Sequence, residues 1–258
     1  MRRLVLVACL LALLVPLAGC GVFADGPPPS DERAVDAVET ANASVADVET
    51  YRFDLAMHVT ASNADRTRSV RVDGNGSVDV RERLMHAVVH AEGNTLHSYV
   101  TSEHAYQECA PPWHGYAVEN VSETGRWATV APLHRQLALL DRTNVYWQGN
   151  RTLDGNRTVL VTASPSAATL TSFVENRQTD SVDLQSGGFE NATVRLWLDP
   201  ETDRPVKFEL RLRLSRGETT ATATLTTHYR DYGAPVSVTV PSNVTDPETQ
   251  YDLGCPAS

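Results

Sequence analysis

The 258-residue sequence contains a single lysine, Lys207, although Lys and Arg together number 22. Asp and Glu number 32, and the formal net charge at pH 7 is −10. A chain this acidic repels nucleic-acid phosphates, so we exclude nucleic acid as a partner. A carboxylate-rich surface with almost no lysine keeps a protein hydrated in concentrated salt, where charge repulsion is screened. We interpret the composition as that of an extreme halophile, with a generic acidic secreted protein as the alternative.

Common catalytic and cofactor motifs are absent from the sequence. There is no GxSxG nucleophile elbow and no glycine-rich phosphate loop. His86 and His90 lie four residues apart, a ligand spacing on a helix, but their segment alternates as a strand does. We therefore predict no catalytic residue, no metal and no cofactor. An uncharacterised hydrolase remains a third hypothesis, because catalytic triads are assembled in space.

Long apolar runs are missing apart from residues 4–17, which follow a basic head at residues 1–3. This run is shorter than the roughly 20 residues that a membrane-spanning helix needs. A basic head, a short apolar region and a small-residue cleavage site predict a secretory signal peptide at residues 1–19.

The signal ends in Leu-Ala-Gly-Cys, the form of a lipoprotein box in which Cys20 becomes the lipidated N-terminus. The alternative is an ordinary signal peptide that is cleaved near Gly21. Residues 20–30 then form the anchor and a stiff spacer with three consecutive prolines. We expect a protein held by its lipid on the extracellular face of the cell membrane.

Only four cysteines occur. Cys9 leaves with the signal and Cys20 takes the lipid, so Cys109 and Cys255 remain as an even pair in an oxidising compartment. A disulfide between them is the natural interpretation. A metal site that uses both thiolates is the alternative, but neither cysteine has a CxxC partner.

Hydrophobic periodicity divides the rest of the chain into helices and strands. Apolar residues at spacings of three and four predict helices in residues 31–48, 130–140 and 166–177. Alternation and turn signals predict strands at 51–59, 69–81, 83–91, 95–100, 104–109, 145–147 and 157–162. No linker divides the chain, so residues 31–258 are predicted to be a single α+β domain.

The most regular stretch, residues 192–241, predicts a β-meander. Residues 206–214 are apolar at every second position, and residues 220–229 place Ala221, Ala223 and Leu225 opposite a row of threonines. A final run with Val236, Val238 and Val240 is expected to continue the meander. One face of these strands is apolar and one is polar, so the apolar face needs a cover.

Two motifs in this stretch resemble a known family. Residues 196–206 read Leu-Trp-Leu-Asp-Pro-Glu-Thr-Asp-Arg-Pro-Val, and residues 229–236 read Tyr-Arg-Asp-Tyr-Gly-Ala-Pro-Val. In this order they resemble the closing half of the lipoprotein-carrier fold of LolA, LolB, LppX and LprG. The resemblance implies a strongly curved antiparallel sheet, a half-barrel, wrapped around two or three helices with an apolar cavity between them.

The resemblance also implies a function. A protein of this kind binds a hydrophobic ligand, such as a lipid acyl chain, an isoprenoid chain or the lipid of a lipoprotein, without catalysis. The alternative is a structural or interaction module of the cell envelope whose core is filled by its own side chains. Small residues such as Ala221 and Ala223 favour room for a ligand, whereas Phe208 and Tyr229 favour filling.

Candidate cavity-lining residues are apolar and mostly aromatic, although buried aromatic side chains are more often plain core. They are Trp113, Trp127, Leu137, Leu140, Trp147, Phe173 and Trp197. Seven Asn-X-Ser/Thr sequons add candidate glycosylation sites for a surface protein. These are Asn42, Asn75, Asn120, Asn150, Asn156, Asn191 and Asn243.

Overall fold

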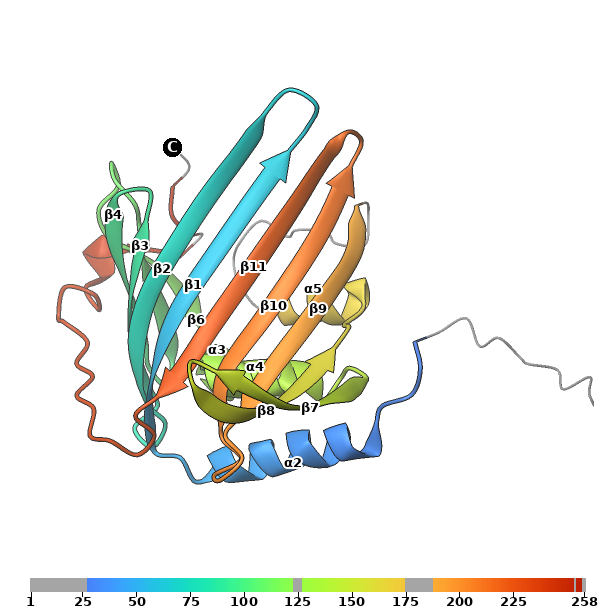
Figure 1. The fold of residues 1–258 in the computed structure, drawn as a ribbon. Helices are drawn as coiled ribbons and strands as arrows, with labels where there is room; N and C mark the ends of the chain where they lie inside the picture. Colours follow the sequence, from blue (N-terminus) through green and yellow to red (C-terminus); the bar gives the residue numbers. More distant parts are fainter. Residues whose placement is uncertain (1–26, 123–126, 175–187, 253, 257–258) are drawn as a thin grey trace, which may run out of the picture.

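The computed structural model describes residues 27–122, 127–174, 188–252 and 254–256. Within them the fold is mainly β, with a 12-stranded sheet in the order β12-β6-β5-β4-β3-β2-β1-β11-β10-β9-β8-β7 (Figure 1). Neighbouring strands are antiparallel, except that β12 runs parallel to β6. The sheet therefore consists almost entirely of hairpins between strands that follow one another in the chain.

The strands differ in length, and those at the centre of the sheet are the longest. The first half of the chain forms β1 (Thr50–Ser62), β2 (Thr67–Asp79), β3 (Leu84–Ala91), β4 (Asn94–Val100), β5 (His104–Glu108) and β6 (Tyr116–Asn120). The second half forms β7 (Val145–Leu153), β8 (Asn156–Ala163), β9 (Phe189–Leu198), β10 (Pro205–Arg216), β11 (Thr219–Arg230) and β12 (Gln250–Tyr251).

The helices are short. They are α2 (Glu32–Ala46), α3 (Trp127–Val130), α4 (Pro132–Leu140) and α5 (Ala167–Val174). Asp31 caps α2 by accepting a hydrogen bond of 3.0 Å from the backbone N–H of Arg33. All three predicted helical segments are thus confirmed, although part of the third prediction, residues 175–177, lies outside the described residues.

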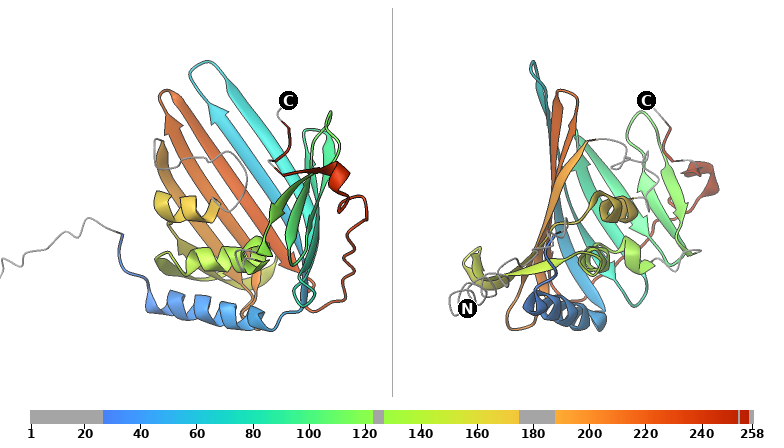
Figure 2. Two further views of the ribbon diagram at one scale, coloured as in Figure 1. Left: turned by 180° about the vertical axis from the view of Figure 1, so that it is seen from behind. Right: turned by 90° about the vertical axis from the view of Figure 1, so that its right-hand side faces the viewer.

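Helices α4 and α5 lie on one face of the long strands β1, β2, β9, β10 and β11, which we call the inner face (Figure 2). Strands β3 to β6 turn toward the same side and form a wing opposite that face, while α2 lies across the lower end of the sheet. The hairpins β1–β2 and β10–β11 extend beyond the helices.

The predicted half-barrel is wrong in one respect, because the sheet is not strongly curled. Strand β1 pairs with β2 on one side and with β11 on the other, and neither pairing contains a bulge. These three strands therefore stay extended. The sheet turns between β2 and β3, where Gly74 and Gly76 lie. A β carbon at Gly74 would collide with the carbonyl oxygen of Val88, and one at Gly76 with the ring of Phe53. The close approach at this turn therefore requires glycine.

The predicted last strand of the meander is also wrong. The sheet part of the meander ends at Arg230, and residues 234–241 contain no strand. Pro235 and Pro241 lack the N–H that a ladder needs, and both edges of β11 are already occupied by β1 and β10. This segment instead carries the chain to the outer side of the wing, where Val240 and Val244 pack against Tyr99, Tyr106 and Tyr116.

The C-terminal segment is held on the wing by covalent and polar contacts. Cys109 and Cys255 form a disulfide with an S–S distance of 2.06 Å. The hydroxyl of Tyr251 donates a hydrogen bond of 2.9 Å to the carbonyl oxygen of His114. Strand β12 adds to the edge strand β6, so the tail both covers the wing and protects its edge.

Candidate functional site

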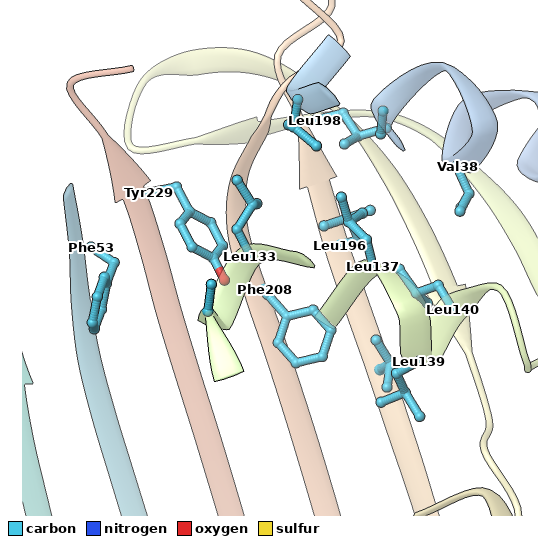
Figure 3. Packing of buried hydrophobic residues seen from close by; sticks show 14 of the residues in the cluster. Val38, Phe53, Leu133, Leu137, Leu139, Leu140, Leu196, Leu198, Phe208 and Tyr229 are labelled. Carbon is cyan, nitrogen blue, oxygen red and sulfur yellow. The ribbon is translucent and has the colours of Figure 1, made fainter. Parts of the chain in front are cut away.

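The inner face of the long strands has two halves, and the lower half is filled by side chains of the protein itself. Leu133, Leu137 and Leu140 of α4 and Phe208 of β10 are each 1% exposed or less. In Figure 3 these leucines lie over Phe208, with Leu196 beside them. This half of the face is packed core.

A buried polar group lies within this core. Gln136 of α4 accepts a hydrogen bond of 2.5 Å from the Tyr229 hydroxyl and donates one of 2.9 Å to Oγ1 of Thr227. Burial raises the pKa of Tyr229 well above its ordinary value, with a smaller contribution from neighbouring Tyr51. These hydrogen bonds satisfy side chains that are 5% exposed or less, and they fix α4 on β11.

The upper half of the inner face is apolar but only half-buried, and we call it the open apolar face. It consists of the inward-facing apolar residues of four adjacent strands, in the part of each strand toward the hairpin tips. Its residues are Leu55, Met57 and Val59 of β1, Val70 and Val72 of β2, Leu210, Leu212 and Leu214 of β10, and Ala221, Ala223 and Leu225 of β11. Val70 is 39% exposed, and the other members are half-buried. Four of these half-buried residues pack against the core at one side: Leu55, Leu210, Leu212 and Leu214.

Small side chains form a low line through the middle of this face. Ala223 pairs with Val59 on one side and with Leu212 on the other. Ala221 pairs with Ala61 and Leu214 in the same way. The larger side chains of β1 and β10 therefore flank a strand that carries only methyl groups at these two positions. We call this line of small side chains along β11 the trough.

Two arginines lie at the outer end of the same face. Side chains alternate along a strand, so Arg68 of β2 lies on the inner side, two residues nearer the hairpin tip than Val70. In the same way, Arg216 of β10 lies two residues nearer the tip than Leu214. Both side chains are exposed. Among the described residues neither guanidinium has an ion pair or a hydrogen bond. The open apolar face thus ends in positive charge in an otherwise acidic chain.

The residues expected to line a cavity are scattered. Leu137 and Leu140 belong to the packed core, and Trp127 is 7% exposed at the start of α3. Phe173 of α5 is half-buried under the guanidinium of Arg135, 4.2 Å from its ring centroid. These four residues lie on the helices α3, α4 and α5.

The other three predicted lining residues lie elsewhere. Trp147 of β7 stacks with Arg33 of α2 at 4.0 Å, and Trp113 is 37% exposed in the loop after β5. Trp197 lies on the outer face, where the Nζ atom of Lys207 is 4.9 Å from its ring centroid. The structure does not bring these aromatic side chains together.

The sequence indicated room for a ligand at Ala221 and Ala223, but the other residues of the open apolar face were not among the predicted lining residues. The alternation at residues 206–214 and the two alanines of residues 220–229 pointed to it. The emphasis on large aromatic residues obscured this signal, because these aromatics pack as core or lie on the outer face.

Chemistry-bearing groups are sparse in the described residues. No group of three or more His, Cys, Asp and Glu side chains is placed there to hold a metal ion. None of the described helices is long and apolar enough to cross a membrane. The lipidation residue, Cys20, lies outside the described residues.

The sequons differ in accessibility. Asn42 is half-buried in α2, where its amide nitrogen donates hydrogen bonds to Asp141 Oδ1 at 3.0 Å and to the Val38 carbonyl at 3.2 Å. The remaining sequon asparagines are exposed: Asn75, Asn120, Asn150, Asn156, Asn191 and Asn243. A glycan on Asn42 would displace contacts between α2 and the residue that follows α4, so this sequon is the least suited to modification.

Comparison with known proteins gives structural similarity at low sequence identity. No protein-family model matches the sequence, and no curated protein matches it. Among solved structures, the lipoprotein LppX of Mycobacterium tuberculosis is 13% identical, with a TM-score of 0.48, over 81% of this chain and 100% of that chain. LprF of Mycobacterium bovis is 17% identical, with a TM-score of 0.42, over 83% and 99% of the two chains. A LolA superfamily protein of Nitrosomonas europaea is 10% identical, with a TM-score of 0.29, over 83% and 98%.

Proposed function

We propose that this protein binds a single hydrophobic chain, such as a lipid acyl or isoprenoid chain, on the open apolar face, without catalysis. The observation that carries the proposal is the contrast between the two halves of one face. The lower half is sealed by α4, whereas the upper half keeps Leu212, Leu214 and Val59 half-buried around Ala221 and Ala223. A contiguous apolar patch of this kind marks a binding surface.

The energetics of such binding are simple. Each buried methylene contributes about 0.8 kcal/mol, so ten of them give roughly 8 kcal/mol before the entropy of immobilising the chain is subtracted. No catalytic residue is needed for this function.

The arginines at the end of the face give the ligand an orientation. A chain lying along β11 from Leu225 toward Ala221 places its polar end near Arg68 and Arg216. Guanidinium groups bind carboxylate and phosphate well. An amphiphile with an anionic head therefore fits the face in one direction.

The proposal includes a lipid anchor at Cys20, a spacer at residues 20–30 and a single binding domain at residues 31–258 outside the membrane. The end of the spacer is attached to the domain. The carbonyl oxygen of Pro28 accepts hydrogen bonds of 2.6 Å from the Tyr146 hydroxyl and 2.9 Å from Asn144 Nδ2. Eight residues from Cys20 to Pro28 span at most about 29 Å, so the domain would remain close to the membrane surface.

Native mass spectrometry tests this function. A Cys20→Ser chain made without residues 1–19, which carries neither the signal peptide nor the lipid, is purified and analysed for non-covalent lipid. Reproducible lipid that is released on denaturation would support the proposal and identify the ligand class. A chain that is empty and also fails to bind added fatty acid or phospholipid would contradict it.

The second candidate is an envelope interaction module that binds no small ligand. The packed lower half, in which α4 already fills the space over Phe208, favours it. An empty chain that instead pulls down one envelope protein through the open apolar face would place this candidate first.

A further inference from the structure

Positive charge is concentrated at the tips of the two central hairpins, β1–β2 and β10–β11. Residues 63–73 and 211–219, which we call the basic tips, contain six arginines and three carboxylates, a net charge of +3. Since the whole chain carries −10, the remainder carries −13. The six arginines are all exposed: Arg66, Arg68, Arg71, Arg211, Arg213 and Arg216.

The two tips form one surface. Strands β1 and β11 pair as far as Ser62 and Thr220, so the turn of one hairpin lies beside the turn of the other. Both hairpins extend beyond the helices (Figure 2). A partner can therefore contact both turns at once.

Most of the positive charge at the tips is free. Nε of Arg71 lies 3.8 Å from Oδ1 of Asp73, and Arg213 pairs with Glu190. The other four guanidinium groups have no ion pair and no hydrogen bond among the described residues. They remain available to an anionic partner.

Two further carboxylates lie among these arginines without neutralising them. Asp65 and Glu218 are exposed in the two turns, and neither forms an ion pair within the described part of the chain. The four free guanidinium groups outnumber these two carboxylates, so the basic tips attract anions although the chain as a whole is acidic.

Apolar surface adjoins the basic tips. Val70, two residues from Arg68, is 39% exposed, and Leu214, two residues from Arg216, is half-buried. Apolar side chains beside basic groups bind an anionic bilayer, which offers acyl chains to the first and head groups to the second. An acidic protein matches the charge but has no acyl layer, so the combination favours a bilayer.

We propose that the basic tips dock on the surface of an anionic lipid bilayer, where their guanidinium groups bind lipid phosphates. The inference rests on the proposed function, since docking brings the open apolar face to the acyl layer from which its ligand would come. Docking itself requires no bound ligand. The described chain enters the domain beside α2, at the other end of the long strands (Figure 1). An anchored domain therefore meets its own membrane with the tips when these strands lie along it.

Vesicle flotation tests the docking. The chain made without residues 1–19 and with Cys20→Ser has no lipid of its own, so binding to vesicles comes from the protein. We expect at least tenfold tighter binding to phosphatidylglycerol vesicles than to phosphatidylcholine vesicles, because only the former carry a net negative charge. Binding should weaken when NaCl is raised from about 0.1 M to about 1 M, because the Debye length falls from about 10 Å to about 3 Å.

A charge reversal in one turn locates the contact. Arg66→Glu should weaken binding to phosphatidylglycerol vesicles about tenfold or more, because each basic residue near an anionic surface strengthens binding several-fold. Arg157→Glu is the matched control and should bind as the unaltered chain does. Arg157 is also exposed next to a hairpin turn and has no ion pair among the described residues, but it belongs to β8, away from the basic tips (Figure 1). Both variants should keep the fatty-acid binding of the unaltered chain, and circular dichroism checks that they are folded.

The docking proposal is overturned if the chain ignores phosphatidylglycerol vesicles, binds phosphatidylcholine vesicles equally well, or is weakened equally by the two variants. It is also overturned if polyglutamate at equal charge displaces the chain completely, which would assign the tips to an acidic protein. Fatty-acid binding by the same chain would leave the proposed function standing in each of these cases. Vesicle binding without fatty-acid binding would uphold the docking and contradict the proposed function.

Discussion

The side-chain amide of Gln136 on α4 accepts a hydrogen bond of 2.5 Å from the hydroxyl of Tyr229 on β11. This contact lies where the packed half of the inner face ends. In the next inward-facing positions of β11, Thr227 is fully buried and Leu225 is half-buried. The pair therefore fixes how far α4 extends over the sheet and where the open apolar face begins.

Replacing Gln136 with Leu should destabilise the protein by about 1–3 kcal/mol, because the buried hydroxyls of Tyr229 and Thr227 lose their partner. Urea unfolding followed by circular dichroism measures the change. Gln148→Leu is the matched control, since Gln148 makes a similar hydrogen bond of 3.1 Å to Thr162 on the exposed surface and should change stability by about 0.5 kcal/mol or less. Equal effects of the two variants would show that the buried pair has no special role.

Removing the disulfide with Cys109→Ser should destabilise the fold by about 2–5 kcal/mol, because the loop it closes spans 146 residues in sequence. Cys255→Ser should have the same effect. In both variants, limited proteolysis should cut the C-terminal segment near Tyr251 before it cuts the sheet. A tail as resistant as that of the unaltered chain would mean that β12 and the Val244 contacts hold it without the covalent bond.

Stability should fall as the pH is lowered from about 6.5, the ordinary value for histidine. Burial lowers the pKa of His86, His134 and His228, with smaller contributions from His97 to the first and from Lys207 to the third. The folded state then binds fewer protons than the unfolded state in this window, so stability is full above pH 6.5 and is lost below it.

His134→Gln should flatten this dependence, because the buried Nδ1 of His134 has no hydrogen-bond partner among the described residues. The midpoint of urea unfolding measured from pH 8 to pH 5 gives the slope. His58→Gln, on the exposed part of β1, should leave the slope unchanged. An unaltered slope in His134→Gln would assign the effect to the other two histidines.

The sequence predicted the hairpins well because their cause is local. The alternation at residues 206–214 predicts β10, and the Asp-Pro and Arg-Gly turns on either side define its hairpins. How much of the sheet is covered depends on where α4 lies, which is set by contacts such as that of Gln136 with Tyr229, 93 residues apart in sequence. No local pattern carries that information.

The same distinction between local patterns and long-range contacts explains why the site was only partly predicted. Trp197 alternates with Leu196 and Leu198 along β9, so strand parity places it on the outer face, away from the cavity that it was predicted to line. The expected strong curvature came from the resemblance to the carrier fold and was wrong. Curvature depends on bulges and on close approaches such as that of Gly76 to Phe53, which alternation does not reveal.

Filling the trough should weaken ligand binding without unfolding the protein. In Ala223→Phe, the ring would occupy the low line between Val59 and Leu212. Binding of a fluorescent fatty acid to the Cys20→Ser chain, measured by titration, should weaken about tenfold or more, since several methylenes lose their contacts. Ala56→Phe places the same ring on the outer face of β1 and should leave binding unchanged. Equal binding by both variants would show that the ligand lies elsewhere.

The arginines at the end of the open apolar face should select the head group of the ligand. Arg68→Gln and Arg216→Gln together should weaken binding of a fatty acid about tenfold, since the loss of a hydrogen bond to a charged group amounts to about 1.5–3 kcal/mol. The same pair of changes should leave binding of the fatty alcohol of equal chain length unchanged. Arg71→Gln is the control, because Arg71 is in the same half of β2 but lies on the outer face, where its Nε is 3.8 Å from Asp73 Oδ1. If acid and alcohol bind equally well to the unaltered chain, the face recognises only the apolar chain and the arginines have no part in selecting the ligand.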